Sequence, residues 1–174
     1  MAQKRAFNEG KRHFRKNKKP KTSDSSGVAE GSNEEVLVAD VRRLLEGVEV
    51  TDTALPAPWS EVEVTIDEMS STGDGLARRE GQVYVVPFGT PGDVVRVKVV
   101  RHDAHERYSL TDYLGLTAPG PFRSAETPPC RYFTACSGCQ FQHLPYAYQL
   151  AHKTRVVEKA FRTFSGLPAD ALPA

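Results

Sequence analysis

The sequence has no long apolar run and very few cysteines. Among its 174 residues, no apolar stretch approaches the ~20 residues that a membrane-spanning helix needs. No apolar leader segment follows the first methionine, so neither membrane insertion nor secretion is expected. Three cysteines are too few, and an odd number, for the disulfide framework of a small secreted protein. We therefore expect an intracellular protein in the nucleus or the cytoplasm, with the mitochondrion as an alternative.

Common catalytic motifs are also missing. No glycine-rich phosphate loop joins a strand to a helix, and no nucleophile elbow is present. The loop carboxylates Asp74 and Glu80 have no neighbour in the sequence that would give them a catalytic role. We expect no catalytic residue within this chain.

The charge is unevenly distributed. The formal net charge is +1, yet residues 1–21 contain nine Lys or Arg and one Glu. Residues 1–31 are rich in Lys, Ser and Gly without apolar periodicity, which predicts a disordered basic tail. Such a run is typical of a nuclear-import signal or of an arm that contacts phosphates. The plainer interpretation is a solvated tail that keeps the chain soluble.

A short helix is predicted over residues 32–47. Ser32 and Glu35 have the spacing of a capping box. Apolar residues follow at helical spacing up to Gly47, a residue type suited to ending a helix. The helix either docks on the next domain or binds another protein, because alone it would be marginal. Residues 48–59 then form a proline-containing linker that ends at Trp59.

A small barrel is predicted over residues 60–118. Residues 61–67 alternate between apolar and polar types, the pattern of a half-buried strand. Residues 70–82 form a glycine-containing loop. Further strands are expected over 82–88, 94–102 and, more weakly, 107–114. Four or five short strands in this length indicate a mainly β fold, a small antiparallel OB-like barrel flanked by short helices.

The rest of the chain divides into three segments. Residues 119–145 contain the cysteines, residues 146–166 read as a helix, and residues 167–174 form a trailing linker. Most charged residues of the helix lie off an apolar stripe whose members recur at helical spacing. The members of the stripe are Tyr146, Leu150, Val157, Phe161 and Phe164.

The three cysteines have the spacing C-x5-C-x2-C at Cys130, Cys136 and Cys139. This motif supplies three of the four thiolates that a [4Fe–4S] cluster needs. His143 lies four positions further on and could complete a Cys3His zinc site. The third alternative is that the thiols are reduced and hold no metal.

The barrel offers a second candidate site, for nucleic acid. Basic side chains on the predicted strands and loop could contact phosphates: Arg78, Arg79, Arg96, Lys98 and Arg101. Tyr84 and Phe88 provide rings on which bases could stack. The alternative is that the charges solvate one face of the barrel while the aromatic rings fill it.

These segments together resemble a known family. The stretch EVEVTIDEMSSTGDGLARREGQVYVVPFGTPGDVVRVKV resembles a TRAM domain, a small RNA-binding barrel. The stretch CRYFTACSGCQFQHLPYAYQLAHKTRVVEKAFRTFSGL is similar to the segment that follows this barrel in RNA uracil-5-methyltransferases, most of all the fungal tRNA type. The resemblance covers residues 60–167. The joint order of barrel, cysteine motif and helix is more specific than the barrel alone.

The resemblance implies a function and its cofactors. It implies that Cys130, Cys136 and Cys139 ligate a [4Fe–4S] cluster, and that the barrel helps to position structured RNA, in particular the T-loop of tRNA. It implies S-adenosylmethionine as the methyl donor and attack by a cysteine on the uracil ring. In the family these catalytic parts lie in a C-terminal domain, so we expect the chain that stops at Ala174 to be inactive alone. The alternative is a stand-alone TRAM RNA-binding adaptor with a Cys3His zinc site.

Overall fold

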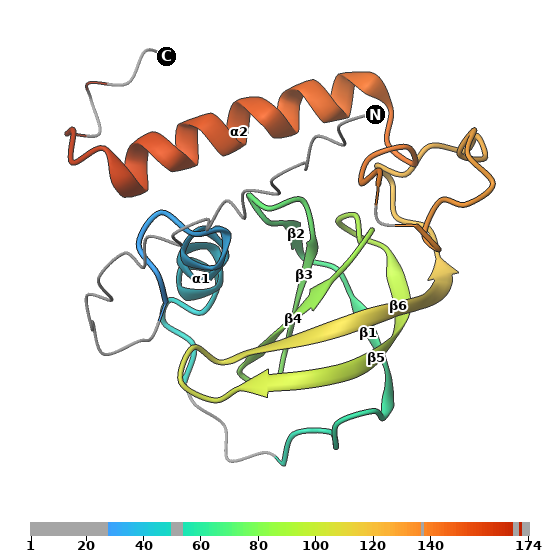
Figure 1. Ribbon diagram of the computed structural model, residues 1–174, viewed down its shortest axis with the longest axis horizontal. Coiled ribbons are helices and arrows are strands. Elements are labelled where there is room, and N and C mark those ends of the chain that lie inside the picture. The colour runs from blue at the N-terminus through green and yellow to red at the C-terminus, as the bar shows by residue number, and fades with distance from the viewer. Residues whose placement is uncertain (1–27, 50–53, 137, 169–170, 172–174) are drawn as a thin grey trace, which may run out of the picture.

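The computed structural model places a curled β-sheet beside a short helix, with a longer helix at one end (Figure 1). It describes residues 28–49, 54–136, 138–168 and 171. Most of the predicted basic tail, residues 1–27, and most of the trailing linker lie outside the described residues.

Six strands form one mostly antiparallel sheet. The strands are β1 (Glu61–Thr65), β2 (Glu68–Met69), β3 (Gly75–Arg79), β4 (Gln82–Val86), β5 (Val94–Asp103) and β6 (Tyr108–Ala118). Their order across the sheet is β1-β5-β6-β4-β3-β2. Only the β4–β6 pair among these neighbours is parallel. The predicted small, mainly β barrel is confirmed, with more strands than the four or five expected.

The predicted loop over 70–82 is wrong in its second half, which forms β3 and the start of β4. Strand β3 escaped detection because its first three residues are all buried and its last two are all exposed. It therefore lacks the alternation that marks a half-buried strand. A β-carbon on Gly75 would lie 2.9 Å from the α-carbon of Gly89, so glycine allows β3 to approach the chain that follows β4.

The barrel interior is filled mainly by branched side chains from several strands. Val95, Val97 and Val99 of β5 point inward and are fully buried, while Arg96 is exposed between them. The alternation seen in the sequence therefore places one face of β5 in the core. The inner cluster consists of Val64, Ile66, Ala77, Tyr84, Val86, Val95, Val97 and Val99.

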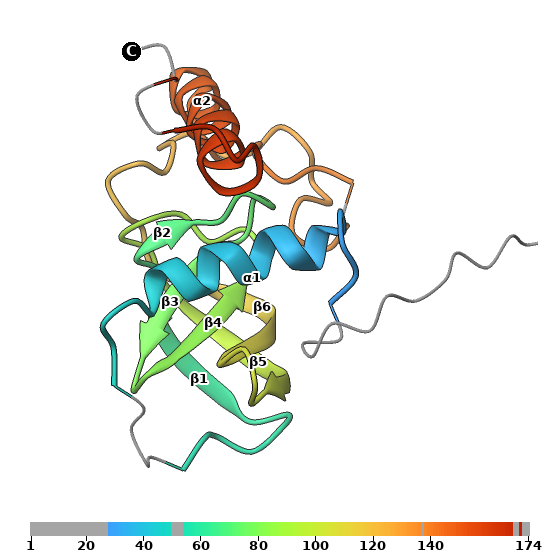
Figure 2. The same cartoon turned by 90° about the vertical axis from the view of Figure 1, so that its left-hand side faces the viewer.

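Helix α1 (Asn33–Leu44) covers the outer face of the β3–β4 part of the sheet (Figure 2). Its apolar face packs in one cluster with Val83 and Val85 of β4 and with Tyr108 of β6. Because Tyr84 and Val86 point the other way into the barrel, every residue of β4 is buried. The helix thus docks on the barrel.

The start of α1 follows the predicted capping pattern. The Ser32 hydroxyl accepts a hydrogen bond from the Glu35 amide at 3.1 Å. The Glu35 carboxylate in turn accepts from the amide of Gly31 at 2.6 Å. The first bond satisfies a backbone donor that a helix start leaves open, whereas the second reaches the residue before the N-cap instead of the N-cap amide of a standard capping box.

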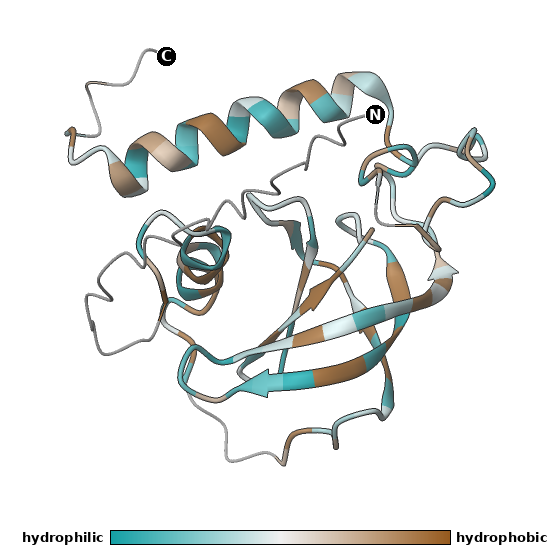
Figure 3. Cartoon of the chain, in the orientation of Figure 1, coloured by the Kyte–Doolittle hydropathy of each residue, from teal (hydrophilic) through white to brown (hydrophobic). Residues whose placement is uncertain are grey.

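Helix α2 (Tyr146–Phe164) presents its apolar stripe to solvent. Leu150, Val157 and Phe161 are each about half exposed or more. The helix attaches instead through its opposite face, where His152 is its one buried residue and Lys159 forms an ion pair with Asp40 of α1 at 2.9 Å. Figure 3 shows apolar residues recurring along α2, which lies apart from the apolar strands of the barrel.

Candidate functional site

The cysteines lie on one loop between β6 and α2. Tight turns shape this loop: the Phe133 amide donates to the Cys130 carbonyl at 3.0 Å, and the Cys136 amide donates to the Tyr132 carbonyl at 2.9 Å. Cys136 and Cys139 are exposed, and Cys130 is partly exposed. All three are free thiols, so soft ligands of the type that iron–sulfur clusters use are accessible on one loop.

The described residues contain no group of three or more His, Cys, Asp or Glu side chains arranged to hold a metal ion. The donor chemistry suits a thiolate-bound cluster, while the loop is not preassembled around one. His143 does not complete a Cys3His site in this arrangement. Its Nε2 atom lies 2.8 Å from the Thr90 hydroxyl oxygen, so the imidazole forms a hydrogen bond with the barrel. The alternative of a Cys3His zinc site is therefore not supported.

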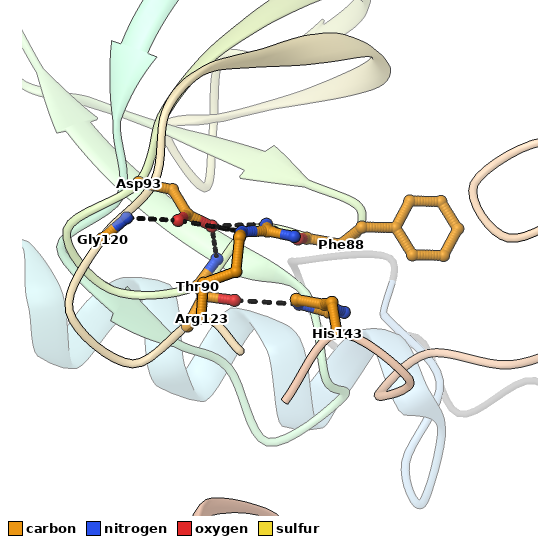
Figure 4. Close-up of polar contacts among 6 residues, drawn as sticks. All are labelled: Phe88, Thr90, Asp93, Gly120, Arg123 and His143. Carbon is orange, nitrogen blue, oxygen red and sulfur yellow. Dashed lines mark hydrogen bonds and ion pairs between the residues drawn. The ribbon is translucent and has the colours of Figure 1, made fainter. Parts of the chain in front are cut away.

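A buried polar clamp joins the cysteine segment to the barrel (Figure 4). Asp93, in the turn before β5, is fully buried. Its carboxylate accepts a hydrogen bond from Arg123 Nη2 at 2.5 Å and one from the Gly120 amide at 2.7 Å. It also accepts from the Thr90 amide at 2.9 Å. Arg123 and Gly120 lie after β6, so the clamp fixes the start of the cysteine segment to the barrel.

His143 extends this clamp to the far end of the same segment. Its carbonyl accepts a hydrogen bond from the Ser124 amide at 2.9 Å, and its ring centroid lies 5.3 Å from that of Phe133. Burial, followed by the nearby Arg123 charge, lowers the pKa of His143 to about 4. The ring is therefore neutral at pH 7, and its buried Nδ1 has no hydrogen-bond partner among the described residues.

The aromatic stacking surface predicted on the barrel is wrong for Tyr84, which is almost fully buried in the core. Phe88 is half-buried and makes edge-on contacts with Tyr113 and Phe133, at ring-centroid distances of 5.9 Å and 5.2 Å. The alternative interpretation, in which these rings fill the structure, is correct for Tyr84. Phe88 therefore packs between the barrel, through Tyr113, and the cysteine loop, through Phe133.

The predicted basic residues do lie on the surface, but the structure does not gather all five. Arg78 and Arg79 sit at the exposed end of β3, and Arg79 pairs with Glu80 at 3.3 Å.

The other three cations follow one another along β5: Arg96, Lys98 and Arg101. Arg96 pairs with Glu61 at 3.7 Å, and Arg101 pairs with Glu34 at 3.9 Å. Exposed pairs of this length are weak, so these cations remain available to a phosphate.

Three notable side chains of this region have no signal in the sequence. Asp93 and Arg123 lie in turns without periodicity, and their pairing joins residues far apart in sequence. Trp59 is predicted only as the end of a linker, and the residue is 63% exposed. Residues 90–93, TPGD, have the composition of a turn, which does not indicate that Asp93 is buried.

Comparison with known proteins identifies the barrel. Residues 59–110 match the TRAM domain. The barrel is a TRAM domain. The match begins at Trp59 and ends within β6, which continues to Ala118. The match thus includes the β5 cations, strands β1 to β5 and the start of β6 up to residue 110.

The matches to whole proteins extend beyond the TRAM domain. The chain is 40% identical over 149 residues to the tRNA (uracil(54)-C(5))-methyltransferase of Schizosaccharomyces pombe, covering 84% of the chain and 28% of that protein. It is 31% identical over 169 residues to the enzyme of the same name from Saccharomyces cerevisiae, covering 86% of the chain and 26% of that protein. An uncharacterized RNA methyltransferase of Porphyromonas gingivalis is 35% identical over 95 residues, or 55% of the chain and 20% of that protein.

These matches confirm the resemblance to the RNA uracil-5-methyltransferases: the chain is a homologue of the tRNA enzymes over the segment that it shares with them. It spans about a quarter of the length of these two relatives. In the part of the chain that the structure describes, no helix has the length and apolar character needed to cross a membrane.

Proposed function

We propose that this chain is the RNA-binding N-terminal portion of an S-adenosylmethionine-dependent tRNA (uracil-5-)-methyltransferase. The TRAM domain and the homology to the two fungal enzymes support this proposal. The partner is tRNA or another structured RNA, encountered in an intracellular compartment. S-adenosylmethionine would supply the methyl group in the whole enzyme.

The clamp between Asp93 and Arg123 is the observation that carries the structural part of the proposal. It fixes the cysteine segment to the TRAM domain with a fully buried carboxylate and a nearly buried guanidinium. A rigid unit of this kind presents the β5 cations and the cysteine loop to RNA in a constant geometry. Preorganisation lowers the entropy cost of binding a structured partner.

RNA binding by the 174-residue chain tests the proposal. We expect the fluorescence anisotropy of a labelled tRNA transcript to increase as the chain is added. The binding should weaken at higher salt. The control is a DNA duplex of similar length. The joint variant Arg96→Gln/Arg101→Gln should weaken tRNA binding several-fold, whereas Arg79→Gln at the end of β3, away from the β5 cations, should weaken it less. Absence of tRNA binding, or equal binding of the DNA, would overturn the proposal.

Methyl transfer is proposed for the whole enzyme and not for these residues alone. Incubation of the chain with S-adenosylmethionine and tRNA should therefore give no 5-methyluridine. Formation of that product would show that a catalytic site lies within this segment.

We further propose that Cys130, Cys136 and Cys139 provide three ligands of a [4Fe–4S] cluster. Their thiols lie on one loop and are accessible, and the sequence contains no fourth cysteine. A cluster in this segment alone would therefore need one external ligand and should be labile. Anaerobic reconstitution with iron and sulfide should give iron and acid-labile sulfide bound to the chain, and the triple Cys→Ser variant should bind neither. Equal iron uptake by that variant, or zinc binding without sulfide, would contradict the cluster.

A further inference from the structure

Trp59 is an exposed ring on a backbone that several hydrogen bonds hold in place. Its amide donates to the Val99 carbonyl at 2.6 Å, and the Val99 amide donates to the Ser60 carbonyl at 2.9 Å. Just before it, the Pro56 carbonyl accepts from His102 Nε2 at 2.8 Å. These contacts attach residues 56–60 to β5. Trp59 is nevertheless 63% exposed as a residue, so its backbone is fixed while its bulky side chain is not buried.

The backbone of Trp59 adopts a left-handed conformation, with φ at +70°. Residues with a β-carbon adopt this conformation rarely, and a bulky aromatic residue there is unusual. Glycine would suit the same turn better. The core does not explain the tryptophan, because its ring is mostly outside it. An unfavourable backbone conformation that holds a side chain toward solvent is typical of a binding position.

Cations lie next to the ring. Lys98 Nζ is 5.8 Å from the centre of the Trp59 ring, within the range of a cation–π contact. Arg96 and Arg101 lie along the same strand, and their partners Glu61 and Glu34 are 3.7 Å and 3.9 Å away. The ring therefore sits beside one group that attracts phosphate, Lys98, on a strand that carries two further cations.

Carboxylates balance these cations on the same sheet. Glu61 is the cross-strand partner of Lys98 on β1, and Asp112 is its partner on β6. Because phosphate affinity depends on net positive contacts, charge alone does not explain binding here. The indole must supply much of the affinity, and a base is the part of RNA that an indole can stack against. An apolar protein partner fits less well, because the Lys98 ammonium lies over the ring.

We propose that Trp59 is a stacking platform for one unpaired base of RNA, with Lys98 beside it to neutralise the adjacent phosphate. The inference rests on the proposed RNA-binding function and adds a defined contact to it. The segment leading into β1 lies on the side of the barrel opposite α2 (Figures 1 and 2). RNA bound at Trp59 would thus engage a part of the TRAM domain remote from α2. Stacking tolerates any base, so the site would select unpaired over paired RNA and not one sequence.

The chain contains one tryptophan, so its intrinsic fluorescence reports on this ring directly. We expect a single-stranded oligoribonucleotide of mixed sequence to quench the emission in a saturable way. A duplex of the same sequence should quench much less, because its bases are already stacked. Labelled RNA followed by anisotropy then gives the affinity independently of the tryptophan.

The decisive variant is Trp59→Gly, which suits the left-handed backbone and keeps the turn while removing the ring. We expect it to weaken single-stranded RNA binding by roughly 5- to 100-fold, the range for loss of one stacked base. The loss should be similar at low and high salt, because stacking is not screened. Lys98→Gln should weaken binding less, and its effect should fade at high salt. Leu114→Ala, which shortens another exposed side chain of the sheet, is the matched control and should change affinity less than twofold.

The outcomes separate this inference from the proposed function. If the chain binds RNA, and Trp59→Gly binds equally well with an unchanged melting temperature, the platform is overturned while the RNA-binding function stands. If wild-type chain binds no RNA, both are overturned. A third outcome is that the tryptophan emission shifts to the blue as the protein concentration rises without RNA, and that RNA does not quench it. This outcome would mean that the ring lies between copies of the chain, and it would overturn the stacking platform.

Discussion

Arg123 Nη2 lies 2.5 Å from the buried Asp93 carboxylate, and the same atom donates to the Phe88 carbonyl at 2.9 Å. One guanidinium therefore connects the segment after β6 to both ends of the loop between β4 and β5. The carboxylate is fully buried, and the arginine side chain is 11% exposed. The pair is the main polar link between the TRAM domain and the cysteine segment.

Arg123→Met should be strongly destabilising. It leaves the Asp93 charge buried without its counter-ion, and breaking a buried pair in this way costs about 3–5 kcal/mol. The measurement is the free energy of unfolding from urea titration, combined with hydrogen exchange of residues 120–145. Exchange there should speed up more than in β5. The control Arg96→Met removes a member of an exposed pair and should change stability by about 0.5 kcal/mol or less. Equal effects of the two variants would show that the clamp is not structural.

Gly120→Ala should disturb the same junction by a steric route. A β-carbon at this position would lie 2.5 Å from the Pro91 carbonyl oxygen and 2.7 Å from the Asp93 amide nitrogen. Both are backbone atoms, so relief requires the loops to separate, at a cost of about 1–3 kcal/mol. The melting temperature of the variant measures this cost. Gly115→Ala on β6 is the matched control because nothing lies within 4 Å of its added carbon. A Gly120→Ala chain as stable as the control would contradict the close approach.

His143 should make the chain less stable as the pH falls. Its pKa is lowered from 6.5 to about 4 in the folded state, first by burial and then by Arg123. Between these pH values the unfolded chain binds a proton that the folded chain does not, so stability rises with pH across this window. The slope contributed is at most ~1.4 kcal/mol per pH unit. The pKa of His152 is lowered as well, chiefly by burial, and it acts in the same direction.

The His143 contribution is the difference between wild type and His143→Gln in how the free energy of unfolding changes from pH 4.5 to 6.5. In His143→Gln the pH slope should fall relative to wild type, whatever the effect on stability at pH 7. His105→Gln provides the comparison, because His105 has an exposed side chain. A wild-type slope retained in His143→Gln would place the titration elsewhere.

Lys159→Met should loosen α2 without unfolding the barrel. Lys159 Nζ donates to the Asp40 carboxylate at 2.9 Å, and α2 buries only His152 besides. Without this tether, amide exchange along α2 should accelerate, and the melting temperature should also fall because the nearly buried Asp40 carboxylate loses its counter-ion. Lys153→Met, on an exposed position of the same helix, should leave exchange unchanged. Wild-type exchange in the Lys159 variant would mean that apolar packing holds the helix.

The sequence alone predicted those features that depend on neighbours along the chain. Ser32 and Glu35 are three residues apart, and the Ser32 hydroxyl caps the first turn of α1 by accepting from the Glu35 amide, as predicted. The alternation in β5 reports which face is buried, since side chains of a strand point to opposite faces. Strand β3 was missed because its burial does not alternate.

Contacts between distant segments limited the prediction of the candidate site. Cys130, Cys136 and Cys139 were placed on one loop from their spacing, whereas their use as cluster ligands stays a prediction. His143 looked like a possible fourth ligand by spacing, yet it contacts Thr90, 53 positions earlier. Tyr84 looked like a stacking ring, but α1 and the barrel together bury β4 on both faces.

The sequence by itself determined the local elements: a capped helix, strands of period two, a cysteine loop and an amphipathic helix. Only the tertiary structure decided their surroundings. It buried Asp93 with Arg123, turned the apolar stripe of α2 to solvent and left the Trp59 ring uncovered on a fixed turn. The physical reason is that periodicity records which face of an element is apolar, whereas a neighbour tens of residues away determines what each face meets.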